Sequence, residues 1–192
     1  QETHLHPYAL GNQKERLTLM VPFDNWGGAF ISSEDNDYSP DVLAHKDGFK
    51  RFDPNQYQSH EVQVESAVDV MSALFSSLRS MGLSKGVIKI DIEGFESLVL
   101  KAIASTVPED FELMIIFENW NTEASLPLLK LGSTQEGEFF YLANDMRPWP
   151  FLPRTINSLY NFIRGGHSVS LAPLTKTLPP GTCVLTIRPC KI

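Results

Sequence analysis

The order of helical and strand patterns between residues 67 and 117 constrains the fold of this chain more than any other feature. In two segments, apolar side chains recur at three- and four-residue steps, which is the spacing of one face of a helix. Two short apolar runs that follow them have the composition of buried strands. The predicted order is helix 67–81, strand 86–92, helix 95–103 and strand 111–117. Such an alternation with short connections is typical of a parallel α/β sheet.

Both ends of the first predicted helix carry residues that favour helix ends. Ser66 directly precedes the apolar periodicity, and its hydroxyl can accept a hydrogen bond from a free backbone amide of the first turn. Gly82 follows Met81, the last periodic residue, and suits the left-handed conformation that commonly ends a helix. We therefore predict Ser66 as the N-cap and Gly82 as the residue that ends the helix.

The rest of the chain adds less regular strands and two irregular segments. Alternating leucine and valine side chains predict a half-buried strand at 16–22. Residues 33–60 are polar, lack periodicity and are expected to form a surface excursion, and residues 146–166 are expected to form an inserted loop and helix. Further strands are predicted at 3–10, 138–142 and 182–188. The 192 residues show no internal repeat and suit a single domain, 1–192.

Composition argues against two kinds of partner. The 16 basic and 23 acidic residues give a net charge of −7, whereas nucleic-acid binding needs clustered Lys and Arg. No apolar run approaches the roughly 20 residues of a membrane-spanning helix. Cys183 and Cys190 are too few for a disulfide scaffold and lack metal-ligand spacing, which favours a reduced, cytoplasmic protein.

The most informative side chains lie at the end of the predicted strand 86–92. Because side chains alternate along a strand, Lys89, Asp91 and Glu93 are expected to point to one face. The two carboxylates fall where the strand meets the next helix, and this edge of an open α/β sheet is where ligands bind. A structural interpretation remains open, in which Asp91 bonds backbone amides of that helix and Glu93 favours its positive end.

Residues 89–96 (KIDIEGFE), followed by Val-Leu-Lys at 99–101, resemble the signature of the FkbM family of S-adenosylmethionine-dependent methyltransferases. That signature reads Lys-Ile-Asp-Val-Glu-Gly, one variable residue, Glu, and then Val-Leu-Lys, so only Ile92 departs from it. Further segments resemble the family in the same order, with Trp26 as a departure in the second of them. These segments are 8–11 (YALG), 25–28 (NWGG), Asp69 and 115–118 (IIFE).

The resemblance implies a class I methyltransferase fold. This fold is a doubly wound, mostly parallel α/β sheet of Rossmann-like type, with one antiparallel strand near its edge. Its strand order is 3-2-1-4-5-7-6, in which strand three would end at Leu10 and strand four would be 87–92. Residues 182–188 would form the antiparallel strand.

The resemblance also implies an activity and a set of site residues. S-adenosylmethionine is the implied cofactor, and O-methylation of a hydroxyl on a glycan or other small-molecule acceptor is the implied reaction. Asp91 would be the base or the group that orients the acceptor, with Glu93 and Glu118 as secondary site residues. The implied cofactor contacts are Gly11 and Asn12 near the adenine, and the turn of Asn25, Gly27 and Gly28, which either closes over the cofactor or only forms a hairpin.

The glycine-rich cofactor loop of the family has no counterpart in these residues. Neither Gly27-Gly28 nor Gly165-Gly166 follows a buried strand and opens a helix. The resemblance therefore implies the C-terminal portion of a longer enzyme, inactive alone. Without strands one and two, residues 1–10 are expected either to be detached from 87–92 or to pair in a position that differs from the family's, which would leave 87–92 with an open edge.

Two other classes of function remain open. One is a methyltransferase-like binding module without activity. The other is a magnesium-dependent hydrolase that uses Asp91, Glu93 and Glu118 as oxygen ligands. Nothing in the sequence favours a nicotinamide-dependent oxidoreductase. His4 and His6 would share a strand face but lack a third ligand, so no metal site is predicted.

Overall fold

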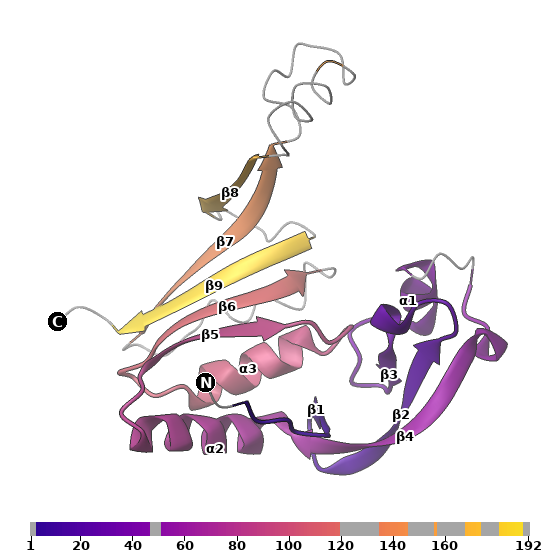
Figure 1. The fold of residues 1–192 in the computed structure, drawn as a ribbon, viewed down its shortest axis with the longest axis horizontal. Coiled ribbons are helices and arrows are strands. Elements are labelled where there is room, and N and C mark those ends of the chain that lie inside the picture. The colour runs from indigo at the N-terminus through magenta and orange to yellow at the C-terminus, as the bar shows by residue number, and fades with distance from the viewer. Residues whose placement is uncertain are drawn as a thin grey trace.

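A computed structural model of the chain describes residues 3–46, 51–119, 135–145, 156, 168–173 and 181–189. Cys190 and all but one residue of the predicted insertion at 146–166 lie outside the described residues. The described strands form two sheets (Figure 1). We call the sheet built from residues 9–66 sheet A, and the sheet built from residues 85–189 sheet B.

Sheet A contains four strands in the order β1-β4-β2-β3. Their bounds are β1 Ala9–Gly11, β2 Glu15–Pro22, β3 Phe30–Ser32 and β4 Tyr57–Ser66. β2 pairs antiparallel with both β3 and β4, whereas β1 pairs parallel with the end of β4. The connections contain three short helices, η1 Trp26–Gly28, α1 Pro40–Lys46 and η2 Pro54–Gln56.

Aromatic side chains pack sheet A against α1. The rings of Phe30 and Tyr57 meet edge to face with centroids 5.6 Å apart, and Phe52 lies against both. The cluster is completed by Met20, Tyr38 and Leu43. Residues 33–60, expected as a surface excursion, thus contain α1, η2 and the start of β4, together with buried side chains of this cluster.

Sheet B contains five strands in the order β5-β6-β9-β7-β8. Their bounds are β5 Lys85–Ile90, β6 Glu112–Asn119, β7 Gln135–Asp145, β8 Ser168–Pro173 and β9 Gly181–Pro189. β5 and β6 are parallel, and every other neighbouring pair is antiparallel.

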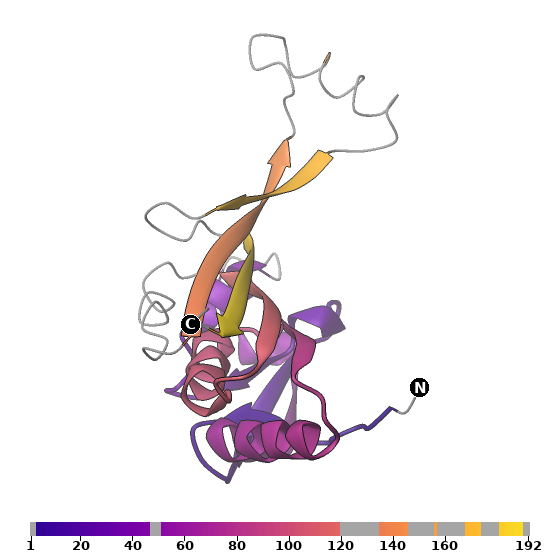
Figure 2. The ribbon, with the colours of Figure 1, turned by 90° about the vertical axis from the view of Figure 1, so that its left-hand side faces the viewer.

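Two helices, α2 (Ala67–Ser80) and α3 (Glu96–Thr106), pack against sheet B and lie next to each other in both ribbon views (Figure 1, Figure 2). Both predicted ends of α2 are confirmed. The Ser66 hydroxyl accepts a hydrogen bond from the Asp69 amide at 3.3 Å, and Gly82 has a φ of +72° just beyond the helix. Among the described residues, no helix has both the length and the apolar character needed to span a membrane.

The main core lies between these two helices and sheet B. Phe75 of α2 meets Phe111 edge to face with ring centroids 5.4 Å apart, and both side chains are 1% exposed. Leu98 of α3 contacts this core and also a smaller cluster. That smaller cluster consists of Ile31 and Val64 of sheet A and Phe95 at the start of α3. Leu98 therefore connects the packing of the two sheets.

The predicted fold class is wrong. The sequence predicts one doubly wound, mostly parallel sheet, whereas the described residues form two mixed sheets with three α-helices. Residues 182–188 do belong to an antiparallel strand, but β9 lies in the middle of sheet B rather than near its edge. Each parallel pair in a sheet needs a crossover, usually a helix, and among the described residues of sheet B only α3 joins two parallel neighbours.

The open edge expected for residues 87–92 is confirmed, because β5 is an edge strand of sheet B. The expectation that this strand is covered on both faces is wrong, since Val87 is 68% exposed. The related expectation for the N-terminus is confirmed, because β1 pairs with β4 and not with β5. The strand predicted at 3–10 is shorter than expected and covers only Ala9–Gly11.

Candidate functional site

Asp91 follows the last residue of β5 and is open to solvent. Its carboxylate accepts a hydrogen bond from the Lys89 ammonium at 2.5 Å, and the two side chains are 50% and 67% exposed. The expectation that Lys89 and Asp91 share one face is therefore confirmed. This ion pair raises the pKa of Lys89, first through the hydrogen bond to Asp91 and then through the negative charges of Asp91 and Glu118.

Glu118 lies near the end of β6, which runs parallel to β5. Ile90 of β5 is paired with Phe117 of β6, so Asp91 and Glu118 each come one residue after the last paired position. The carboxyl ends of the two strands thus bring both carboxylates near the Lys89 ammonium. Of the predicted catalytic residues, the structure brings Asp91 and Glu118 together in this way.

The turn between β5 and α3 has an unusual backbone. Glu93 has a φ of +25° and Gly94 a φ of +95°, a region that residues with a side chain rarely adopt. The Gly94 amide donates a hydrogen bond to the Glu96 carboxylate at 2.8 Å. Glu96 is only 5% exposed, and this burial raises the pKa of its carboxyl group against the opposing effect of backbone hydrogen bonds. The second glutamate of the 89–96 segment thus stabilises the turn.

Asp91 does not cap the helix that follows β5, so the structural interpretation of this residue is wrong. The residue at the N-cap position of α3 is Phe95, and no side chain caps that end. The hydrogen bond that Asp91 accepts comes instead from Lys89. Asp91 is therefore exposed at a strand end without being used to terminate the following helix.

Gly11 and Asn12 line a cavity of about 370 Å³. Its other lining residues are Asp35, Asp37, Ala67, Val68, Ser97, Leu98, Lys101, Ala102 and Ser105. A Cβ atom on Gly11 would lie 2.5 Å from the side chain of Val64, so this position needs a glycine for β1 to pack on β4. The cavity adjoins the Glu93–Gly94 turn, because the Asp37 amide donates to the Gly94 carbonyl at 2.9 Å.

The other predicted cofactor residues are not part of this cavity. Asn25, Gly27 and Gly28 belong to the turn around η1 between β2 and β3, as the hairpin interpretation expects. Trp26 at the centre of this turn is 82% exposed, and a Cβ on Gly27 would meet only the Asn25 side chain, at 3.5 Å. The structure therefore does not bring the predicted cofactor residues together.

The ligand set of a magnesium-dependent hydrolase is not present in the described part of the chain. There, no three His, Cys, Asp or Glu side chains lie close enough together to hold a metal ion. Asp91, Glu93 and Glu118 all belong to the described residues. His4 and His6 are both exposed, and His6 lies against the ring of Tyr8 with centroids 5.5 Å apart.

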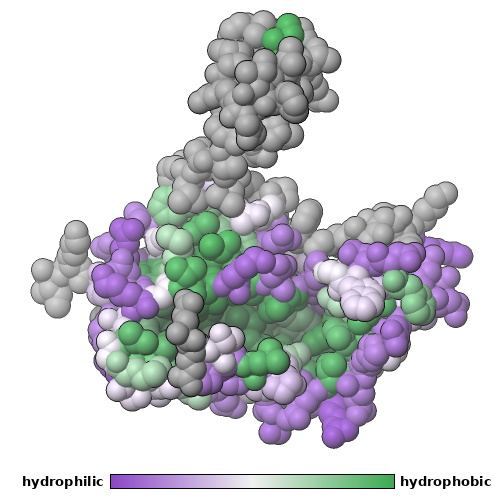
Figure 3. Space-filling model, in the orientation of Figure 1, coloured by the Kyte–Doolittle hydropathy of each residue, from purple (hydrophilic) through white to green (hydrophobic). Residues whose placement is uncertain are grey.

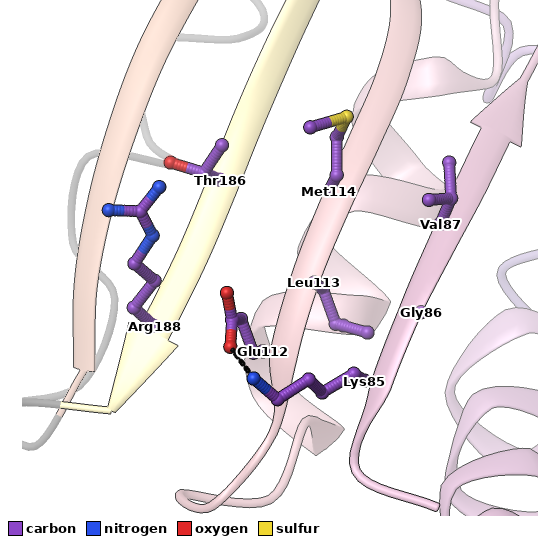
Figure 4. A pocket seen from close by; sticks show the side chains of 8 residues that line it. All are labelled: Lys85, Gly86, Val87, Glu112, Leu113, Met114, Thr186 and Arg188. Carbon is purple, nitrogen blue, oxygen red and sulfur yellow. Dashed lines mark ion pairs between the residues drawn. The ribbon is translucent and has the colours of Figure 1, made fainter.

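A second cavity, of about 360 Å³, lies at the opposite ends of β5 and β6. Figure 4 shows its lining, with Val87, Leu113 and Met114 beside the ion pair of Lys85 and Glu112, which has an N–O distance of 2.6 Å. Figure 3 shows hydrophobic side chains gathered over sheet B and flanked by hydrophilic ones. None of the predicted site residues lines this cavity.

Sequence reasoning missed the residues that hold the Glu93–Gly94 turn from outside. Asn36, Asp37 and Ser97 contact this turn or each other, and two of them lie in the segment expected to be a surface excursion. No motif surrounds Asn36 and Asp37, whose contacts are with residues about 60 positions away in the chain. Of the three residues, only Ser97 could have been noticed from the sequence, because it directly follows residues 89–96.

Comparison of the chain with protein-family models, with curated proteins and with solved structures returned no match. The resemblance of residues 89–96 to the FkbM signature thus remains an interpretation of the sequence.

Proposed function

We propose that residues 1–192 form part of an S-adenosylmethionine-dependent methyltransferase that methylates a hydroxyl group of a sugar or small metabolite. The signature at 89–96 supports this activity, and the exposed position of Asp91 is the observation that carries it. A general base must be able to reach the proton that it removes, and a carboxylate at the open end of a strand can do so.

The surroundings of Asp91 suit this role. Lys89 donates to it and, with Glu118 also nearby, balances the negative charge at the ends of β5 and β6. Asp91 would therefore orient the acceptor hydroxyl and accept its proton, while Glu118 would supply a second acceptor of hydrogen bonds.

The described residues fit only one part of the cofactor. The cavity beside Gly11 and Asn12 has the volume of a small-ligand pocket and offers the amide of Asn12 and the carboxylates of Asp35 and Asp37 to a nucleoside. No glycine-rich turn between a buried strand and a helix lies among the described residues. When bound, the cofactor supplies an electrophilic methyl group, and the residues of this chain position and deprotonate the acceptor.

Two effects would account for the contribution of these residues to rate. Holding the acceptor oxygen in line with the methyl group makes the reaction effectively unimolecular, which can lower the activation barrier by up to roughly 7–11 kcal/mol. Proton transfer to Asp91 would add about 10²–10⁴-fold. Positioning is therefore expected to dominate, with Asp91 contributing to both.

Replacing Asp91 by Asn tests the proposal in the full polypeptide that carries these residues. Asn keeps the size and most hydrogen bonding of Asp91 but removes its charge and its ability to accept the proton. We expect turnover to fall about 10²–10⁴-fold while affinity for S-adenosylmethionine changes little. Turnover is measured by transfer of a labelled methyl group, and affinity by calorimetric titration.

The matched control is Asp110→Asn, since Asp110 is also exposed and paired with a cation, Arg79, at 2.9 Å. It lies before β6, at the end of that strand opposite to Glu118. We expect this change to leave turnover unaltered. Near-normal turnover of the Asp91→Asn variant would contradict the assignment of the base and move it to Glu93.

A second test concerns the cofactor and uses residues 1–192 alone. Because this segment offers a cavity for the nucleoside but no glycine-rich loop, we expect no appreciable binding of S-adenosylmethionine in a calorimetric titration. The positive control is the same titration of the full polypeptide. Micromolar binding by residues 1–192 would contradict the prediction and require a complete cofactor site within them.

A further inference from the structure

The turn that carries Glu93 and Gly94 is held by a loop of sheet A. In Figure 1 the chain that leaves β5 passes close to β3 before it enters α3. The loop between β3 and α1 lies there, and two of its residues, Asn36 and Asp37, contact the turn or the start of α3. A turn with two positive φ angles does not hold its conformation through local preference, so these contacts bear on its geometry.

Asn36 makes the central contacts. Its side-chain amide nitrogen donates to the carbonyl oxygens of Glu93 and Ile31, each at 3.0 Å. Its side-chain oxygen accepts a hydrogen bond from the Tyr38 amide at 2.8 Å. Both ends of one side chain are thus used, and they connect the last residues of β3, the loop and the turn after β5.

Two neighbours of Asn36 extend this connection. The Asp37 amide donates to the Gly94 carbonyl at 2.9 Å, and the Ser97 hydroxyl of α3 donates to the Asp37 carboxylate. Ser97 is only 5% exposed. The carbonyl groups of two successive residues of the turn, Glu93 and Gly94, are therefore both held by the same loop.

Gly94 and Asn36 fit one another closely. A Cβ atom built on Gly94 would lie 1.9 Å from the side-chain oxygen of Asn36 and 2.7 Å from its Cγ. Gly94 is thus required by both its φ and its neighbour. The absence of a side chain at Gly94 lets the Asn36 amide reach the backbone of the turn.

We infer that Asn36 is a positioning residue for the proposed methyl transfer, acting through the backbone between Asp91 and Gly94. This inference rests on the proposed function. Asn36 does not touch the reacting groups but fixes the carbonyl of Glu93, and with it the direction in which the chain leaves Asp91 at the end of β5. Sheet A thereby contributes to the geometry of a site on sheet B.

The contacts themselves are tested in residues 1–192 by amide hydrogen exchange of the Asn36→Ala variant. We expect the Asp37 and Tyr38 amides to exchange roughly tenfold faster or more, because their acceptors are lost or released. The matched control is Asn55→Ala, since Asn55 bonds only Asp53, within its own turn, at 2.9 Å. Unchanged exchange at both amides in the Asn36→Ala variant would overturn the inference whatever the reaction of the enzyme.

The effect on the reaction is tested in the full polypeptide by separating turnover from binding. We expect Asn36→Ala to lower kcat about 10–10²-fold with little change in the KM for the methyl donor, and Asn55→Ala to change neither. Asn36→Asp is a second variant. It keeps an oxygen that accepts from the Tyr38 amide but removes the side-chain nitrogen that donates to the carbonyls of Ile31 and Glu93. It should lower kcat similarly even if Asn36→Ala does not fold.

The two proposals fail differently. Normal kcat in folded Asn36→Asp enzyme, while Asp91→Asn abolishes turnover, would overturn the positioning role and leave the methyltransferase proposal standing. Faster amide exchange without any methyl transfer by the full polypeptide would remove the catalytic part of the inference together with the proposed function.

Discussion

Sheet A and sheet B are stabilised in different ways. Sheet B is covered by α2 and α3, and its main core gathers side chains from these two helices and from the strands β5, β6, β7 and β9. Among the described residues, sheet A packs on the short helix α1 through a small aromatic cluster, and exposed ion pairs such as Arg16–Glu61 accompany its strand pairing. Asp91 and Glu118 lie at strand ends of sheet B, yet the loop that contacts the turn after Asp91 belongs to sheet A. The region with the weaker core therefore still affects the site.

Replacing one aromatic residue in each region should reveal this difference most strongly. Phe75→Ala removes a side chain that is 1% exposed and packed on Phe111, and we expect a loss of about 3–5 kcal/mol in the free energy of unfolding. Phe52→Ala removes a partly buried ring of the sheet A cluster, for which we expect roughly 1–2 kcal/mol. Urea unfolding of both variants measures the two values. Equal losses would mean that the sheet A cluster matters as much as the main core.

The same difference explains which parts of the fold could be predicted from the sequence. α2 and α3 were predictable because their apolar residues repeat with the helical period, and Ser66 and Gly82 mark the ends of α2. β5 and β6 were predictable because each is a short, nearly continuous apolar run. β4 was not predictable, because half of its side chains are exposed and it is stabilised by backbone pairing with β1 and β2. Pairing partners far apart in the chain leave no periodic signal.

The arrangement of the strands could not be derived from local patterns either. The composition of β5 is that of a strand buried on both faces, but its position at the edge of sheet B exposes Val87. For the site, alternation along the strand correctly placed Lys89 beside Asp91. It could not indicate Asn36, whose role depends on the contact between two sheets.

Two glutamates should affect stability with opposite signs as pH changes. Burial raises the pKa of Glu96 above its ordinary 4.5, so the folded state holds the proton more tightly than the unfolded state. The resulting stability is present below pH 4.5 and is lost as pH rises through the raised value. Glu96→Gln should remove this loss while keeping an acceptor for the Gly94 amide. We therefore expect its stability relative to the unmodified protein to increase with pH above 4.5.

Glu112→Gln is the matched control, because Glu112 is the first residue of β6 in sheet B and forms an ion pair with Lys85. The hydrogen bond from Lys85 lowers the pKa of Glu112, so its contribution is present above pH 4.5 and is lost as pH falls through the lowered value. Relative to the unmodified protein, this variant should lose stability as pH rises toward 4.5. Urea unfolding at a series of pH values measures both slopes. If the free energy of unfolding of both variants, relative to the unmodified protein, changed with pH in the same direction, burial would not disfavour the ionised form of Glu96.

The smallest expected effect on stability concerns the edges of the two sheets. The edge strands of sheet A, β1 and β3, have three residues each, and such short edges offer little to another chain. β5 has six residues, and its exposed Val87 lies beside Met114, which is 39% exposed. A longer apolar edge with unpaired backbone groups can accept a strand from a second molecule. Of these three edges, β5 is therefore the one at which we expect association to begin.

Val87→Lys places a charge on that edge. Because Val87 already faces solvent, we expect the free energy of unfolding to change by no more than about 0.5 kcal/mol, whereas concentration-dependent association should decrease. The control is Val42→Lys on α1, where a valine that is 47% exposed lies on a helix and not on an edge strand. Sedimentation velocity over a range of concentrations measures association of both variants. If Val42→Lys reduced association as strongly as Val87→Lys, added charge alone would explain the effect, and the edge of sheet B would have no special part in it.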